Sequence, residues 1–186
     1  SLAKFCGRGE KEMGVLNRMT NGNYVNEDAV KNVIRYITRT RKNENRKNEL
    51  LMYGGKGVAI YEPVDYMIAQ LIYVQCVFGI EQRKGRRMYH EVFSLDPHEF
   101  IRMGRNVNAL WKFADQCAQC YFDAGYQVVY AIHGTNESDL HIHFAVSAIN
   151  FRSGLKWHDS KTDLDMREAL FNKILGKYQY MFIVNK

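Results

Sequence analysis

Apolar residues recur with helical spacing between residues 28 and 42. They form one stripe of an amphipathic helix, at Val30, Val33, Ile34 and Ile37. Asn26 is placed to cap this helix, and acidic residues follow it in the first turn. Tyr36 falls at the edge of the stripe. The pattern predicts that packing holds the Tyr36 ring while its hydroxyl reaches a groove.

Three further helices are predicted, over residues 64–78, 97–123 and 164–175. The middle one has a capping box at its start, with Asp96 as the cap, Pro97 at the first position and Glu99 at the third. Each of the three is expected to stop at a glycine: Gly79, Gly125 and Gly176.

Alternating apolar and polar residues predict strands over 86–95, 126–133 and 140–150. Three other segments are ambiguous. Residues 1–23 suit a short strand or a disordered arm, 50–62 a short strand or turn, and 178–184 a last strand or a continued helix. The whole pattern indicates an α+β fold, a central antiparallel β-sheet with flanking helices.

The chain of 186 residues suits a single domain over 1–186. No apolar run approaches the ~18 residues of a membrane span, so no membrane insertion is expected. The first residues lack the apolar region of a signal peptide. They also lack an initiating Met, which leaves open processing, a tag remnant or excision from a longer protein, of which the chain could be the N-terminal part.

The net charge of +6 favours a polyanionic partner such as a nucleic acid. Cationic residues crowd two segments. The first contains Arg35, Arg39, Arg41, Lys42, Arg46 and Lys47, and the second contains Arg83, Lys84, Arg86 and Arg87.

The four cysteines indicate reduced, buried thiols of a cytosolic protein rather than a zinc site. Cys117 and Cys120 form a CxxC within a helical pattern, with no second CxxC or CxxH to complete the ligand set. The glycine cluster GGKG at 54–57 lacks the spacing of a phosphate-binding P-loop.

Three of the six histidines lie between residues 133 and 143. On a strand, His141 and His143 share one face about 6.6 Å apart, while Ile142, Phe144 and Val146 face a core. Residues 134–140 are rich in turn formers, so a hairpin would return His133 to the side of this pair. Three neutral imidazoles then leave a divalent metal with open positions, as a catalytic site requires.

The order of these parts resembles the relaxases, the MobA/MobL-like DNA nickases of the HUH endonuclease superfamily. A tyrosine on an early helix (VIRYITRTRK) precedes a strand with a carboxylate (MYHEVFSL), a long helix, YAIH and LHIHFAVSAIN. The resemblance spans about residues 26–170. Rolling-circle replication initiators share the histidine motif but usually place it before the tyrosine.

The resemblance implies a role for several residues. Tyr36 matches the nucleophile, and His133, His141 and His143 match the metal ligands. Glu91 matches a carboxylate that some members carry on the strand beside the histidines, and it is expected either to hold a ligating imidazole or to be a solvated strand acid. Ser94 matches a residue near the DNA backbone. Thr135 and Ser147 stand where many members have Asp and Asn.

The implied activity is strand-specific nicking of origin-of-transfer DNA through a 5′-phosphotyrosyl intermediate, followed by rejoining. Single-stranded or locally melted DNA would be the substrate, with Arg35, Arg39, Arg41, Lys42, Arg86, Arg87 and Ser94 contacting its backbone. Tyr24, Tyr53 and Trp157 are candidates for base stacking. The resemblance implies Mn²⁺ or Mg²⁺, although three imidazoles also suit Zn²⁺. It further implies a bacterial cytoplasmic location and accessory relaxosome and secretion-channel coupling proteins as partners.

Two alternatives stay open at this point. One is a replication or transposition initiator of the same superfamily. The other is a non-catalytic nucleic-acid-binding protein whose histidines are buried and hydrogen-bonded.

Overall fold

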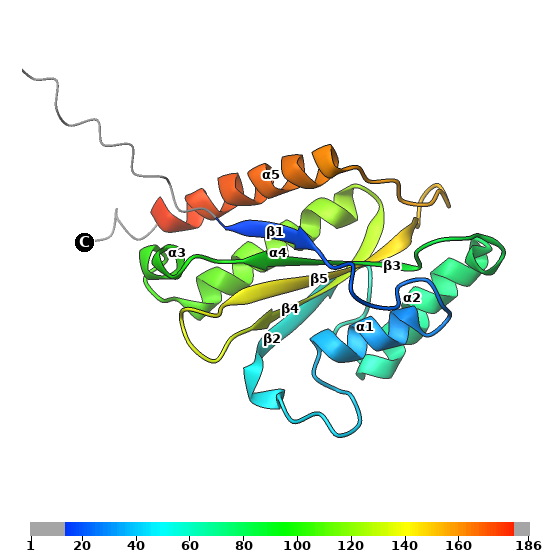
Figure 1. Cartoon of the computed structure of the whole chain (residues 1–186), viewed down its shortest axis with the longest axis horizontal. Helices are drawn as coiled ribbons and strands as arrows, with labels where there is room; N and C mark the ends of the chain where they lie inside the picture. Colours follow the sequence, from blue (N-terminus) through cyan, green and yellow to red (C-terminus); the bar gives the residue numbers. More distant parts are fainter. Residues whose placement is uncertain (1–13, 181–186) are drawn as a thin grey trace, which may run out of the picture.

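A five-stranded antiparallel sheet forms the centre of the computed structural model, which describes residues 14–180 (Figure 1). The strand order is β1-β3-β5-β4-β2. The strands are β1 (Val15–Arg18), β2 (Leu50–Lys56), β3 (Met88–Ser94), β4 (Tyr126–His133) and β5 (His141–Asn150). Consecutive β4 and β5 form the central hairpin, and β1 and β2 lie at the two edges.

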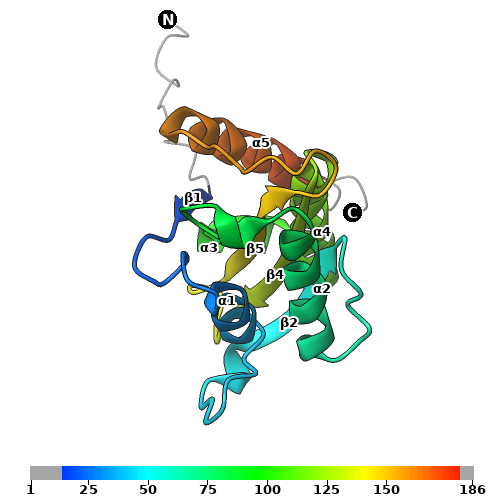
Figure 2. The same ribbon diagram turned by 90° about the vertical axis from the view of Figure 1, so that its right-hand side faces the viewer.

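Helices cover both faces of this sheet (Figure 2). One face packs against α1 (Ala29–Ile37) and α2 (Val64–Val77). The other packs against α4 (Val107–Asp123) and α5 (Lys161–Tyr180). The short elements are α3 (Pro97–Arg102), η1 (Lys47–Glu49) and η2 (Ile80–Gln82). The architecture confirms the α+β fold with a central antiparallel sheet.

Each face has its own apolar core, because successive side chains of a strand alternate between the two sides. Ile142, Phe144 and Val146 of β5 are fully buried on the α4/α5 face, as the alternation predicted. The stripe of α1 is buried on the opposite face, beside Ala131 and Ala145. That opposite face also carries the histidines of β4 and β5.

Two predicted helices are shorter than the periodicity indicated. The first ends at Ile37, and Arg39 has a left-handed backbone with a φ of 53°. The segment 97–123 forms two helices, because Gly104 and Arg105 have φ values of 68° and 53°. The Asn106 side chain accepts hydrogen bonds from two backbone N–H groups and starts α4.

The last helix is longer than predicted. Its start is fixed by a reciprocal pair, in which the Asp163 carboxylate accepts from the Ser160 backbone N–H and the Asp163 N–H donates to the Ser160 hydroxyl. The helix passes through Gly176 and continues to Tyr180. The remainder of the ambiguous segment 178–184 lies outside the described residues, as do residues 1–13.

Cys76, Cys117 and Cys120 are free thiols, so the CxxC forms no disulfide. Among the helices between residues 14 and 180, none combines the length and apolar character needed to cross a bilayer.

Candidate metal and nucleophile site

The β4–β5 hairpin brings three imidazoles together. His133 and His141 are directly opposite in the strand register, and His143 follows two residues along β5 on the same face. One potential ligand atom from each of the three lies within 4.8 Å of the others. The hairpin predicted from the sequence is therefore confirmed, and its histidines cluster as a metal site requires.

Two of these imidazoles are oriented by backbone carbonyls. His133 Nε2 donates to the Ile37 carbonyl oxygen at 2.6 Å, and His141 Nδ1 donates to the Asp139 carbonyl oxygen at 2.6 Å. Such bonds fix the tautomer and ring orientation of metal-ligating histidines. They leave the His141 Nε2 lone pair free, whereas the His133 Nδ1 lone pair accepts from the Arg39 guanidinium at 3.2 Å.

The third imidazole is oriented by another histidine. His143 Nδ1 lies 2.8 Å from His90 Nε2, and His90 Nδ1 lies 3.2 Å from the Tyr24 hydroxyl oxygen. His143 Nε2 is buried and has no hydrogen-bond partner among the described residues. A buried nitrogen without a partner carries a desolvation cost, which a metal ion would remove. The donor set and this nitrogen fit a bound divalent cation.

Burial keeps the His90, His133 and His143 rings neutral. It lowers the pKa of His90 and of His133 to about 4. The pKa of His143 is held well below its ordinary value by burial and by the neighbouring imidazoles. Because a metal binds only deprotonated imidazole, His133 and His143 need release no proton at neutral pH.

We expect acid to destabilise the metal-free protein between pH 7 and 5. The unfolded state, with histidine pKa near 6.5, binds more protons in this window than the folded state, in which His90 and His133 have a pKa of about 4. The loss should be roughly 2 kcal/mol per histidine by pH 5. Urea denaturation with a chelator present measures it.

A His90→Gln variant should show a shallower loss of stability with acid, since one buried imidazole is removed. His158→Ala, at an exposed position, is the matched control and should follow the unmodified chain. Equal slopes in all three proteins would contradict a buried, neutral His90.

Tyr36 lies beside the triad in the last turn of α1. Its ring centroid is 5.6 Å from that of His143 and 5.9 Å from that of His90. The side chain is half-buried, and its hydroxyl makes no hydrogen bond to any residue in 14–180. The buried neighbours Val33 and Ile37 anchor the helix turn that presents it. The structure therefore brings together the predicted nucleophile and the predicted metal ligands.

Arg39 is an internal residue rather than a surface one. Its side chain is 2% exposed, and it pairs with Glu49 at 2.5 Å. The same nitrogen donates to His133 Nδ1 at 3.2 Å, and the guanidinium lies 4.9 Å from the Tyr36 ring centroid. This placement does not match the expected DNA contact of Arg39, because the guanidinium is enclosed next to the triad.

The other cations of this segment are accessible. Arg41 is exposed, with its guanidinium 4.7 Å from the Tyr36 ring centroid, and Lys42 is exposed beside it. Arg35 pairs with Asp65 of α2 at 2.7 Å. Arg41 and Lys42 thus retain the positions expected of phosphate contacts, while Arg35 is partly neutralised.

The second basic segment approaches the site at Tyr24. The Arg86 guanidinium is 4.8 Å from the Tyr24 ring centroid, and the Arg87 side chain is half-buried. Ser94 is exposed at the end of β3, opposite His141 in the strand register. Arg86 and Ser94 therefore flank the triad from two directions.

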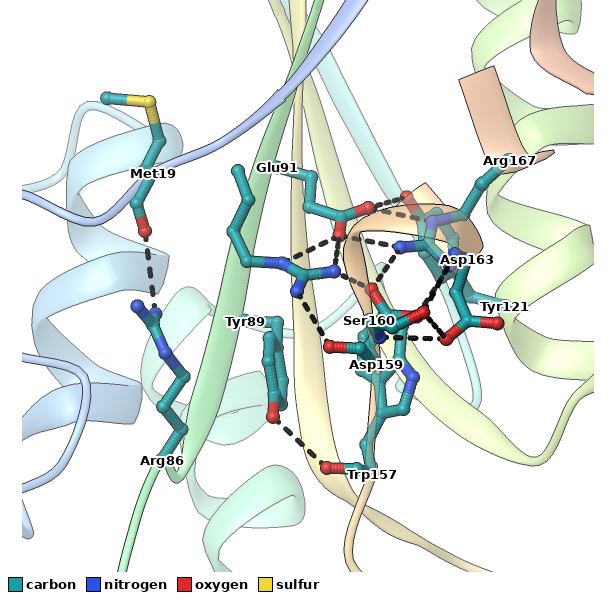
Figure 3. Close-up of polar contacts among 11 residues, drawn as sticks. Met19, Arg86, Tyr89, Glu91, Tyr121, Trp157, Asp159, Ser160, Asp163 and Arg167 are labelled. Carbon is teal, nitrogen blue, oxygen red and sulfur yellow. Dashed lines mark hydrogen bonds and ion pairs between the residues drawn. The ribbon is translucent and has the colours of Figure 1, made fainter. Parts of the chain in front are cut away.

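Glu91 lies on the other face of the sheet (Figure 3). Its fully buried carboxylate accepts from the Tyr121 hydroxyl at 2.6 Å and from Arg167 at 2.9 and 3.0 Å. Arg18 pairs with the same carboxylate at 2.8 Å, and Asp159 binds both arginines. The expectation that Glu91 holds a ligating imidazole is wrong, because adjacent strand residues point to opposite faces.

Replacing Glu91 with alanine should destabilise the fold by about 3–5 kcal/mol, because Arg18 and Arg167 lose a buried partner. Metal affinity should stay unchanged, since the carboxylate does not reach the triad. Urea denaturation and metal titration of the same protein separate the two effects. Glu62→Ala, at an exposed site, should alter neither. A selective loss of metal affinity in Glu91→Ala would contradict this assignment.

His90 is the residue that the sequence interpretation missed. No sequence motif marks it, yet it is buried and contacts His143 directly. The available signal was the alternation of β3, which puts His90 and Glu91 on opposite faces. Choosing between them requires the β3–β5 register, in which His90 pairs with Ala145.

The three candidates for base stacking, Tyr24, Tyr53 and Trp157, lie in different parts of the fold. Trp157 is buried on the α4/α5 face, with its ring 4.6 Å from that of Tyr89. Tyr53 packs against the α1/α2 core from β2. Among the three candidates, only Tyr24 lies next to the site.

Comparison with known proteins agrees with this geometry. A family model described as "Relaxase: MobA/VirD2-like, nuclease domain" matches residues 15–180. A search of curated proteins gave no match.

Proposed function

We propose that this chain, which belongs to the MobA/VirD2-like relaxase nuclease family, nicks one strand of origin-of-transfer DNA with Tyr36 as its nucleophile. The observation that carries this proposal is the approach of the Tyr36 ring to within 5.6 Å of His143. The ring therefore lies beside the histidine cluster, and its hydroxyl makes no hydrogen bond to any residue in 14–180.

The reaction is a transesterification. The Tyr36 oxygen forms a bond to phosphorus as the bond from phosphorus to the 3′ oxygen breaks. The phenol proton is lost to solvent, and the 3′ oxygen leaves as a hydroxyl after taking up a proton. The phosphotyrosine retains the energy of the phosphodiester, so the same 3′-hydroxyl can later reverse the step and rejoin the strand.

His133, His141 and His143 would hold the metal, for which family resemblance favours Mn²⁺ or Mg²⁺ over Zn²⁺. A divalent cation there supplies Lewis-acid polarisation of the phosphate oxygens and neutralises their charge. The chain's own part is orientation. The Ile37 and Asp139 carbonyls and His90 each hold one imidazole, which fixes the cluster before DNA arrives.

The cationic residues beside Tyr36 have two different roles in this proposal. Arg39, held by Glu49, fixes His133 and one side of the tyrosine ring. Arg41 and Lys42 are exposed and would contact phosphates flanking the scissile bond. Arg86, beside Tyr24, and Ser94, beside His141, would contact further parts of the strand.

The proposal also covers the DNA substrate and the partner proteins. The chain would act on single-stranded or locally melted DNA at a transfer origin, together with accessory relaxosome and coupling proteins. The family and the motif order favour this role over replication initiation, since Tyr36 precedes the histidine motif.

Strand transfer tests the proposal. The chain is incubated with Mn²⁺ and a pool of randomised single-stranded DNA, then given a second labelled strand that ends in a 3′-hydroxyl. We expect a covalent protein–DNA adduct and, after the second strand is added, joined products. Cleavage with neither adduct nor joining would indicate hydrolysis by water and would overturn the mechanism.

A further inference from the structure

A pocket of about 390 Å³ opens next to Tyr36. Its walls come from the segment 19–24 between β1 and α1, from α1 and from β3. The lining residues are Met19, Asn21, Gly22, Asn23, Tyr24, Asn32, Val33, Tyr36, Arg41 and His90. The volume lies within the ~300–1,000 Å³ typical of ligand pockets.

The pocket adjoins the metal cluster through one side chain. His90 lines the pocket and lies 2.8 Å from His143. Tyr36, the proposed nucleophile, forms part of its wall. A group that enters the pocket is therefore next to the place where the scissile phosphate must bind.

Two tyrosine rings in this lining are each in contact with an arginine guanidinium group. Arg86 lies 4.8 Å from the Tyr24 ring centroid, and Arg41 lies 4.7 Å from the Tyr36 ring centroid. Aromatic faces stack unpaired bases, and guanidinium groups bind the phosphates that connect them. The combination suits a nucleotide better than an apolar ligand.

Asparagine side chains with unpaired amide groups complete the lining. The side chains of Asn21 and Asn32 make no hydrogen bond to any residue between 14 and 180, and both are exposed. The Asn23 side-chain oxygen Oδ1 accepts from the Val25 and Asn26 backbone N–H groups, which leaves the side-chain NH₂ group available. An amide presents a donor and an acceptor side by side, which matches the paired edges of a nucleobase.

We infer that this pocket takes one unpaired base of the DNA strand, adjacent to the scissile phosphate, and that Asn21 and Asn32 recognise its edge. The inference rests on the proposed function for the position of the phosphate. It assigns sequence selectivity at one nucleotide to this pocket, whereas Arg41 and Arg86 bind without regard to sequence.

Selection from randomised single-stranded 20-mers tests this assignment by binding alone. The Tyr36→Phe chain keeps the ring but cannot form an adduct, so bound strands are recovered and sequenced. We expect a base preference at one position that falls about tenfold or more in Asn21→Ala/Asn32→Ala, as for loss of a paired base contact. Asn108→Ala, an exposed asparagine on α4, is the matched control and should retain the preference.

The outcomes separate the two proposals. A double variant that binds more weakly but keeps every base preference, or a preference that also falls in Asn108→Ala, overturns the pocket assignment. The unmodified chain is tested in parallel for adducts with the selected strands. A missing adduct alongside a lost preference would reject the nicking mechanism and leave the base pocket supported.

Discussion

A Tyr36→Phe chain should form no covalent adduct with single-stranded DNA, a loss of at least about 1,000-fold for removal of a nucleophile. The phenylalanine ring keeps the contacts with His143 and His90, so only the attacking oxygen is removed. DNA affinity and metal affinity should be unchanged. Denaturing electrophoresis of the chain with Mn²⁺ and a labelled strand measures the adduct directly.

Tyr53→Phe is the matched control, because Tyr53 is also a half-buried tyrosine and lies on β2 of the central sheet. It should form the adduct at the unmodified rate. An adduct that persists in Tyr36→Phe and disappears in Tyr53→Phe would move the nucleophile and contradict the proposed site.

A His143→Ala chain should lose metal binding by more than the ~10- to 100-fold typical when a residue that only orients a ligand is removed. The reason is that His143 Nε2 is a ligand atom in this proposal, and two imidazoles would remain. His90→Ala, which removes the hydrogen bond to His143 Nδ1 but no ligand atom, should fall within that range. Calorimetric titration with Mn²⁺ measures both.

His158→Ala serves as the control in this series, since His158 is exposed in the segment before α5. It should bind Mn²⁺ like the unmodified chain. Equal affinity in His143→Ala and His158→Ala would show that the ion binds elsewhere, and the three-histidine cluster would lose its assigned role.

Local patterns were sufficient for the centre of the molecule. The i and i+2 spacing of His141 and His143, with a turn-rich segment before them, indicated a hairpin that returns His133 to their side. The structure places His133 opposite His141 in the register. The alternation of β5 likewise identified Phe144 as a core residue, and it is fully buried.

The family interpretation also followed from local motifs. The resemblance covered about residues 26–170, and the family model matches residues 15–180. The residues that only the family model covers include β1, and Arg18 of β1 lies far in sequence from its partner Glu91. Short motifs identify the family because they contain the reactive groups, while the edge strand depends on pairing with β3.

The wrong predictions concern side chains whose placement depends on tertiary contacts. His90 and Glu91 are adjacent, and sequence alone could not say which side chain faces the triad. Arg39 was expected on a continuing helix, but a left-handed backbone turns it inward to Glu49. The first outcome depends on the β3–β5 register and the second on a local left-handed turn and the Glu49 contact, neither of which is contained in local periodicity.

Mass mapping of the DNA-linked peptide tests most directly whether a metal-assisted phenol of α1 carries out the reaction. Trypsin releases residues 36–39 as the peptide YITR, since Arg35 precedes it and Arg39 ends it. After incubation with single-stranded DNA and Mn²⁺, the nucleotide mass should appear on this peptide, and it should disappear with a chelator. Modification of another tyrosine-containing peptide, or modification of this one without any divalent metal, would contradict the proposed site.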